Sequence, residues 1–563
     1  MAGYKTIISA KRAERDKALQ SATPYLKQTH SEYLSATAAE IVTNIENGRW
    51  TASQVVDAYI ARAAFAHQST NCLTEVLFHQ ARKEAEALDE DFAKTKKLKG
   101  PFHGVPFSFK DLFNIKGFDS SVGFTQWANK PSQVDAPLVA LMRSQGAIII
   151  AKMNVPQTML AFECCNPLWG RTTNPWNADY TSGGSSGGEC ALLALDGAAM
   201  GAGSDIGGSL KIPASYCGVY SFNPSFGRIS RLGIGDPNPG FHALGSVFGP
   251  MSRSVADVEL FCRTAFGVQD SLHKVAPVPY RDVQLPSKLR FGYYTSDEFV
   301  KASPANARAV LETVAALEKQ GHECVEFKIP QPTRAMELFI LITSADGYKK
   351  LTSHLGPDPQ EESLFLATIG PKLPGFIRIM ATWFMVNVLG DSVFATILRS
   401  LKHSSVREYN DYVEQKNIYG ELFYKEVWDK QQFDAIIAPV QAVPVLPHGG
   451  CATLSPLAAA TILYNIVDSP VGTIPVTRVD AFKDELTESW FNAPGHGSKI
   501  LERDIFEGKN PIYDAKKMAN IPVGVQIVRK RWEDEKVISM MHVIDQALGP
   551  RGFGPGKSLQ TKA

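Results

Sequence analysis

The pattern of apolar and polar positions changes period several times along this chain. Val105, Phe107 and Phe109 alternate with Ser108 and Lys110, which is the two-residue period of a strand with one buried face. Successive strand side chains point to opposite faces, so Lys110 shares a face with Ser108, opposite the phenylalanines. The strand predicted over residues 105–110 therefore carries a lysine within an apolar stretch, where burial is expected.

Helical and strand patterns alternate through the rest of the chain. Helices are predicted over 37–98, where Thr37 and Glu40 form a capping box, from Asp135 as N-cap to Gly146, and from Ser303-Pro304 to Gly321. Strands are predicted over 147–151, 289–294, 323–327, 434–440 and 472–479. Strands that alternate with helices predict an α/β fold with helices on the faces of a sheet.

Two segments differ from this globular pattern. Residues 1–36 read as a charged helical arm with few apolar positions. Residues 371–402 are unusually apolar, but their longest uncharged run, Ile379–Gly390, is too short to cross a bilayer. Two interpretations stay open for 371–402: a pair of buried core helices, or a cap-like insertion lying on a membrane interface or over a lipid entrance.

Composition narrows the class of protein. The chain has 563 residues, 44% hydrophobic and 20% charged, with a net charge of +1, which argues against a nucleic-acid partner bound through bulk charge. Its eight cysteines form no C-x-x-C pair and suggest neither a zinc site nor a disulfide framework. The charged N-terminus lacks the apolar core of a signal peptide. A reducing compartment, the cytoplasm, is the expected location.

The chemistry of the chain is concentrated between Ser182 and Pro213. Ser185 stands in GGSSGG and Ser209 in DIGGS, and Lys110 lies upstream in HGVPFSFKDLF. Glycine permits positive φ and close backbone approach, so the N–H groups of 206–209 can turn inward around a developing oxyanion. The apolar residues between the glycines argue against a flexible linker.

These motifs resemble the amidase signature family, in which GGSSGG is followed by DIGGS, a basic residue and a proline. The resemblance covers most of the chain, with a catalytic domain over 37–548 and a C-terminal tail over 549–563. It leans toward the fatty-acid amide hydrolases through the runs at 164–176, 285–299, 371–379 and 462–477. It implies the amidase signature fold, a large twisted mixed β-sheet flanked by helices on both faces, and neither a cofactor nor a metal.

The resemblance also implies a role for each residue of the motifs. Ser209 is the expected nucleophile, Lys110 the base, made neutral by burial, and Ser185 the proton carrier between them, with a cis peptide at Gly184–Ser185. The oxyanion and substrate groups are expected among Ile206, Gly207, Gly208, Ser209, Met159 and Ser185, with Ser186, Asp205 and Lys211 in support. Many family members have arginine at position 211, so the lysine leaves the rigidity of this loop open.

The expected activity is hydrolysis of an N-acyl amide, with a fatty-acid amide as the first choice of substrate. A short-chain acetamidase is an alternative, in which Met159, Leu160 and Phe162 line a small pocket. A non-catalytic subunit, or the glutaminase subunit of an amidotransferase, is another. A nucleophile elbow would make Ser185 the nucleophile, although no apolar strand precedes it. Peripheral contact with an internal membrane through 371–402 and a homodimer are further expectations.

Overall fold

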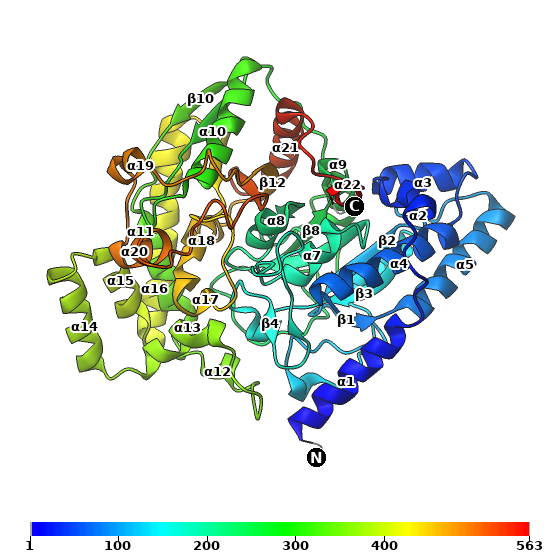
Figure 1. Ribbon diagram of the computed structural model, residues 1–563, viewed down its shortest axis with the longest axis horizontal. Helices are drawn as coiled ribbons and strands as arrows, with labels where there is room; N and C mark the ends of the chain where they lie inside the picture. Colours follow the sequence, from blue (N-terminus) through cyan, green and yellow to red (C-terminus); the bar gives the residue numbers. More distant parts are fainter. Residues whose placement is uncertain (1–2, 562–563) are drawn as a thin grey trace.

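The computed structural model describes residues 3–561, which build around one eleven-stranded mixed sheet (Figure 1). The sheet order is β1 (Leu73–Val76), β3 (Ile148–Met153), β2 (Pro106–Lys110), β6 (Met200–Asp205), β8 (Val247–Ser252), β7 (Tyr220–Asn223), β12 (Val471–Arg478), β13 (Pro522–Val528), β11 (Ala435–Pro439), β9 (Arg290–Tyr293) and β10 (Glu323–Glu326). Strand β2 is parallel to both its neighbours, and β9 to both of its own, whereas the central strands pair antiparallel. A small hairpin joins β4 (Cys165–Asn166) to β5 (Gly170–Arg171).

The helices before the sheet centre are α1 (Tyr4–Leu19), α2 (Lys27–Leu34), α3 (Ala38–Glu46), α4 (Ala52–Thr70), α5 (Phe78–Thr95), α6 (Pro137–Ser144), α7 (Gly187–Ala194), α8 (Lys211–Cys217) and α9 (Val255–Ala265). Those that follow are α10 (Pro304–Lys319), α11 (Pro332–Thr343), α12 (Lys349–Thr352), α13 (Phe365–Ile369), α14 (Gly375–Asn387), α15 (Ser392–Ser400), α16 (Val406–Phe423), α17 (Cys451–Leu454), α18 (Ala459–Ile466), α19 (Glu488–Asn492), α20 (Lys499–Phe506), α21 (Asp534–Leu548) and α22 (Ser558–Thr561).

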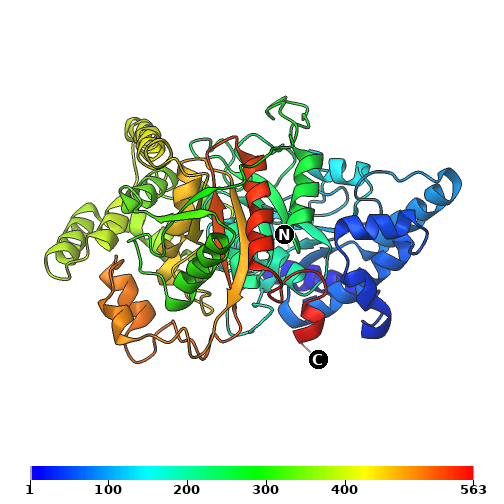
Figure 2. The ribbon, with the colours of Figure 1, turned by 90° about the horizontal axis from the view of Figure 1, so that it is seen from above.

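Helices cover both faces of the sheet (Figure 2). The side chains of β13 point alternately to the two faces, so their contacts identify which helices lie on each face. Gly524 meets α8 through Ser215, and Gln526, on the same face, donates to the Ala460 carbonyl of α18. Gly472 of β12 pairs with Ile527, on the opposite face, and packs against Met541 of α21. Helices α9 and α10 contact α21 and lie on the same face of the sheet as α21.

Most of the expected elements are confirmed. The strands predicted from the apolar runs are present as β2, β3 and β9–β12, the Thr37–Glu40 capping box is formed, and Ser303 caps α10. Two expectations were wrong. The region 37–98 is interrupted by β1, and Asp135 does not cap α6: its carboxylate accepts the Lys116 N–H and pairs with Arg143.

Both ends of the described range, residues 3–561, pack on the body of the molecule. The described part of the predicted arm forms α1 and α2, and two charged side chains of α1, Lys11 and Arg15, are buried. Lys11 is 5% exposed and pairs with Glu75 (2.7 Å) and Asp119 (3.1 Å). These buried pairs need their partners, because an unpaired buried charge is costly. At the other end, the Gly556 N–H donates to the carboxylate of Asp196.

The apolar segment divides into two helices of different character. None of the side chains of α14 is buried, whereas α15 buries Ile397 and Leu398 among other residues. The expectation of a buried core helix pair is therefore wrong for α14, which projects at the edge of the molecule (Figure 1). Within residues 3–561, no single helix is long and apolar enough to cross a membrane, although the bent pair Glu362–Lys372 and Gly375–Asn387, at 110°, passes by length and composition together.

Candidate active site

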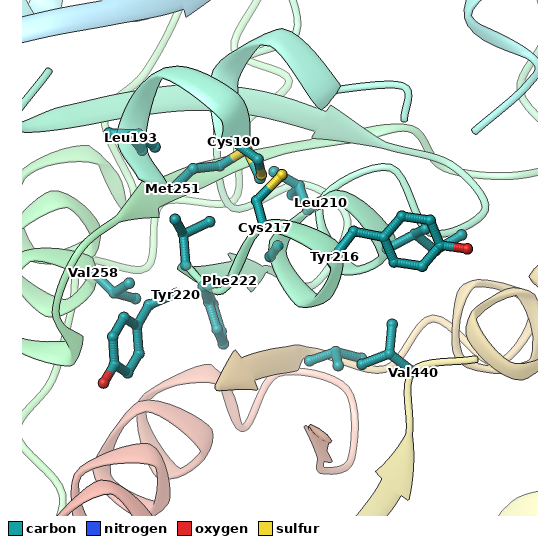
Figure 3. Close-up of a cluster of buried hydrophobic side chains, with 14 of the residues drawn as sticks. Cys190, Leu193, Leu210, Tyr216, Cys217, Tyr220, Phe222, Met251, Val258 and Val440 are labelled. Carbon is teal, nitrogen blue, oxygen red and sulfur yellow. The ribbon is translucent and has the colours of Figure 1, made fainter. Parts of the chain in front are cut away.

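Three chain segments converge on one face of the sheet and carry the predicted site residues. Lys110 is the last residue of β2, Ser185 follows the cis Gly184–Ser185 peptide just before α7, and Ser209 lies in the loop between β6 and α8. Figure 3 shows part of the buried core to which α7 and α8 contribute, where Cys190, Leu210, Cys217 and Met251 lie close together. All four of those side chains are fully buried, so the segments rest on close-packed core.

Lys110 is completely buried, as the alternation along β2 predicts. Phe107 packs on Phe261 of α9, on the opposite face. Lys110 Nζ lies 2.6 Å from Ser185 Oγ and 2.9 Å from Ser204 Oγ. Burial lowers its pKa from the usual 10.5 to about 7, because removing water disfavours the ammonium form. A substantial neutral fraction at pH 7 gives this amine the capacity to accept a proton.

Ser209 is half-buried and faces open space. It lines two cavities, and the second of them also contains Ser185 and Ser204. Within the described residues, the hydroxyls of Ser209 and Ser185 make no hydrogen bond to one another. Catalytic hydrogen bonds are often long before substrate binds, so this spacing is compatible with proton transfer in a complex. No strand leads into Ser185, unlike the turn of a nucleophile elbow.

Asp205 holds the loop that precedes Ser209. Its carboxylate accepts the N–H groups of Gly208 (2.7 Å) and Leu210 (2.8 Å). The expectation that the Gly208 N–H belongs to the oxyanion cradle was therefore wrong, because Asp205 occupies that donor. The N–H groups of Ile206, Gly207 and Ser209 donate to no residue between 3 and 561, so three donors remain for a ligand.

Lys211 restrains the same loop from behind. Its Nζ is fully buried and donates to Asn465 Oδ1 (2.8 Å) and to the Thr461 carbonyl (3.3 Å), at 3.7 Å from Asp205. Asn465 in turn donates to Asp205 Oδ1 (2.9 Å). Burial lowers the pKa of Lys211, and the Asp205 carboxylate opposes that shift. The lysine therefore fixes the loop through contacts on α18 without a guanidinium fork.

The other expected residues lie around this centre. Ser186 donates from Oγ to the Ser204 carbonyl (3.4 Å) and from its N–H to the Ser209 carbonyl (3.4 Å). Met159 has a φ of +59° and lines both cavities, while Phe162 lines the first. Within residues 3–561, no group of three or more His, Cys, Asp or Glu side chains could hold a metal ion.

Sequence reasoning missed three contributors. Ser204 contacts Lys110, Asn465 links Asp205 to Lys211, and the Thr461 hydroxyl donates to the Gly207 carbonyl (2.8 Å). Ser204 precedes Asp205 in the signature, which was the signal available for it. Asn465 stands in the run ILYNIVDSPVG, which the sequence singles out without saying where it folds. Thr461 had no signal of its own.

Comparisons with known proteins agree on one family. A sequence profile named Amidase matches residues 54–538. An acetamidase of Emericella nidulans is 30% identical over 93% of this chain and 91% of its own length. Fatty-acid amide hydrolase 1 of Sus scrofa is 29% identical, covering 95% of this chain and 90% of its own.

A solved structure of a fatty acid amide hydrolase superimposes with a TM-score of 0.81, at 26% identity over 98% of this chain and 91% of that one. The shared fold, the matched profile and the similarity to several amide hydrolases apply to nearly the whole chain. They agree with the mixed sheet flanked by helices described above. The chain belongs to the amidase signature family and is an amide hydrolase.

Proposed function

We propose that this amide hydrolase cleaves N-acyl amides with a long apolar acyl chain, through an acyl-enzyme on Ser209. The observation that carries the proposal is the first cavity, which runs from Ser209 to the buried side of α15. Ligand pockets are lined predominantly by apolar side chains, and so is this cavity. Its apolar lining includes Leu160, Phe162, Met336, Phe339, Ile340, Leu364, Leu366, Ile397, Leu401 and Ile462.

The proton relay follows from the contacts of Lys110. Its neutral amine accepts the Ser185 proton as Ser185 takes the proton of Ser209, whose oxygen attacks the amide carbonyl. The C–N bond then breaks, and Ser185 gives a proton to the leaving amine while Lys110 returns one to Ser185. Water repeats the attack on the Ser209 ester and releases the carboxylic acid. No histidine takes part in this relay.

The oxyanion is assigned to the three free N–H groups of the β6–α8 loop, those of Ile206, Gly207 and Ser209. One such donor contributes roughly 3–4 kcal/mol to catalysis in other hydrolases. Asp205 acts through the loop: by occupying the Gly208 and Leu210 N–H groups it sets the direction of the other three. Asp205 is therefore a positioning residue in this scheme.

The exposed helix α14 supports a lipid substrate and contact with a membrane surface. Phe376, Ile379, Met380 and Trp383 are each more than 60% exposed, and α14 packs beside α15, which lines the first cavity. Exposed contiguous apolar surface of this kind marks interaction sites, membranes among them. A substrate entering from the bilayer would then reach Ser209 through an apolar path.

A series of N-acyl ethanolamides from two to sixteen acyl carbons tests the proposal. Each buried CH₂ contributes about 0.8 kcal/mol, so kcat/KM is expected to rise about fourfold per carbon until the cavity is full. Leu366→Trp, which narrows the cavity, is expected to cut only the long-chain rates, with exposed Leu311→Trp as control. A preference for the two-carbon substrate would instead favour the short-chain acetamidase alternative, which the Emericella relative keeps open.

The alternative subunit roles, the homodimer and the cellular location are separate proposals. A covalent serine probe that labels Ser209 would separate an active enzyme from a non-catalytic subunit, and isolation without a partner subunit would argue against an amidotransferase. The homodimer stays a prediction. All eight cysteines are unpaired, which supports the proposed cytoplasmic location.

A further inference from the structure

A second cavity opens from Ser209 on the side away from α15. It shares Met159, Ile206 and Phe339 with the first. Ser185 lines the second cavity but not the first. An amide bound at Ser209 has an acyl side and an amine side, and Ser185 is the group that protonates the amine. The second cavity is therefore where the amine side lies, if the proposed function holds.

Arg231 stands in the wall of this second cavity without a partner. Its Nε is buried from solvent and makes no hydrogen bond. The whole guanidinium forms neither a hydrogen bond nor an ion pair with any residue between 3 and 561, and its one close neighbour of note is the Phe226 ring at 5.5 Å. A guanidinium carries five donors and stays charged, and donors left unpaired in a partly buried site are costly.

The two carboxylates of the same wall do not satisfy Arg231. Asp236 accepts the Asn238 N–H (2.8 Å) within its own turn. Asp346 accepts the N–H groups of Tyr348 (2.8 Å) and Lys350 (2.9 Å) at the start of α12. Burial lowers the pKa of Arg231, and Asp236 opposes that shift from beyond ion-pair distance. Hydrogen-bond donors on Arg231 thus remain free to receive a ligand.

We propose that Arg231 binds a carboxylate on the amine side of the substrate, so that the preferred substrates are N-acyl amino acids. A carboxylate matches the planar fork of the guanidinium with two parallel hydrogen bonds, which a hydroxyl cannot do. This inference rests on the proposed acyl-enzyme mechanism and names its substrate class. Water adds across the C–N bond, giving a fatty acid and a free amino acid, with no other reactant.

The test compares N-dodecanoylglycine with N-dodecanoyl-ethanolamine in the same assay. Hydrogen bonds to charged groups are worth about 1.5–3 kcal/mol, so Arg231→Gln is expected to lower kcat/KM for the glycine conjugate roughly 10- to 150-fold, mainly by raising KM. The ethanolamine conjugate is expected to change less than threefold. Arg231→Lys restores part of the glycine activity, and Arg407→Gln, at an exposed position on α16, changes neither rate.

The outcomes separate this inference from the proposed function. Turnover of the ethanolamine conjugate with none of the glycine conjugate, or an equal loss of both in Arg231→Gln, overturns the carboxylate site and leaves the long-chain hydrolase standing. If only N-acetylglycine is cleaved and Arg231→Gln removes that activity, the carboxylate site stands and the long acyl chain is wrong.

A binding measurement covers variants with too little activity to assay. In the Ser209→Ala background, calorimetry with N-dodecanoylglycine is expected to show at least tenfold weaker affinity when Arg231→Gln is added. Equal affinity overturns the inference. A thermal melt checks that each variant is folded, and Arg231→Met, which also removes the charge, replaces Arg231→Gln if the latter is not.

Discussion

Replacing Lys110 with methionine should change how the stability of this protein depends on pH. The pKa of Lys110 is about 7 in the folded protein against 10.5 as its usual value. Between these values the unfolded chain holds a proton that the native protein releases. Stability therefore rises with pH across this window, and the native state carries a penalty that is largest below pH 7.

The size of the penalty follows from the shift. Each pKa unit corresponds to about 1.4 kcal/mol, so burial of Lys110 costs about 5 kcal/mol below pH 7 and about 4 kcal/mol at pH 7. Lys110→Met removes this titration. The methionine also leaves the Ser185 and Ser204 hydroxyls without their amine partner, but that loss does not vary with pH. From pH 7 to pH 9, the free energy of unfolding of the original protein should therefore rise by about 2 kcal/mol relative to that of Lys110→Met.

Urea unfolding of both proteins at pH 6, 7, 8 and 9, with refolding checked by dilution, measures this difference. Lys483→Met, at an exposed position, is the control and should show no pH-dependent difference. Parallel stability curves for the original protein and Lys110→Met, within about 0.5 kcal/mol, would refute the reasoning that burial makes this lysine a neutral base.

Four further outcomes are expected. Lys110→Ala should flatten the rise of kcat/KM that the original enzyme shows through about pH 7, as read from a pH–rate profile, and a retained inflection would remove Lys110 as the base. Asp205→Asn should lower kcat about 100-fold with KM within threefold, because the oxyanion loop loses its anchor; steady-state kinetics showing a change in KM alone would contradict this. Gly208→Ala should abolish turnover in the same assay, since φ is +130° and the new Cβ would clash with Thr461, and a wild-type rate would show that the loop adapts. Trp383→Ser should reduce binding to lipid vesicles at least tenfold in sedimentation assays without changing the melting temperature, and unchanged binding would exclude α14 as a membrane contact.

The sequence alone determined the local chemistry of this protein. The alternation around Lys110 placed it on the polar face of a strand, since strand side chains obey a two-residue period wherever the strand lies. The glycines around Ser185 and Ser209 marked loops with unusual backbone geometry, because few other residues adopt it. Several strands and helices with strong apolar periods were predictable for the same local reason, whereas β1, β6, β7, β8 and β13 of the large sheet were missed.

Only the tertiary structure decided what depends on residues distant in the chain. Asn465 and Thr461 reach the Ser209 loop from α18 because β12 and β7, far apart in sequence, pair in the sheet. The occupied Gly208 N–H, the exposed face of α14 and the unpartnered guanidinium of Arg231 likewise depend on what packs around each group. Burial and hydrogen-bond partners are set by long-range contacts, and the apolar composition of a segment does not reveal which of its faces finds them.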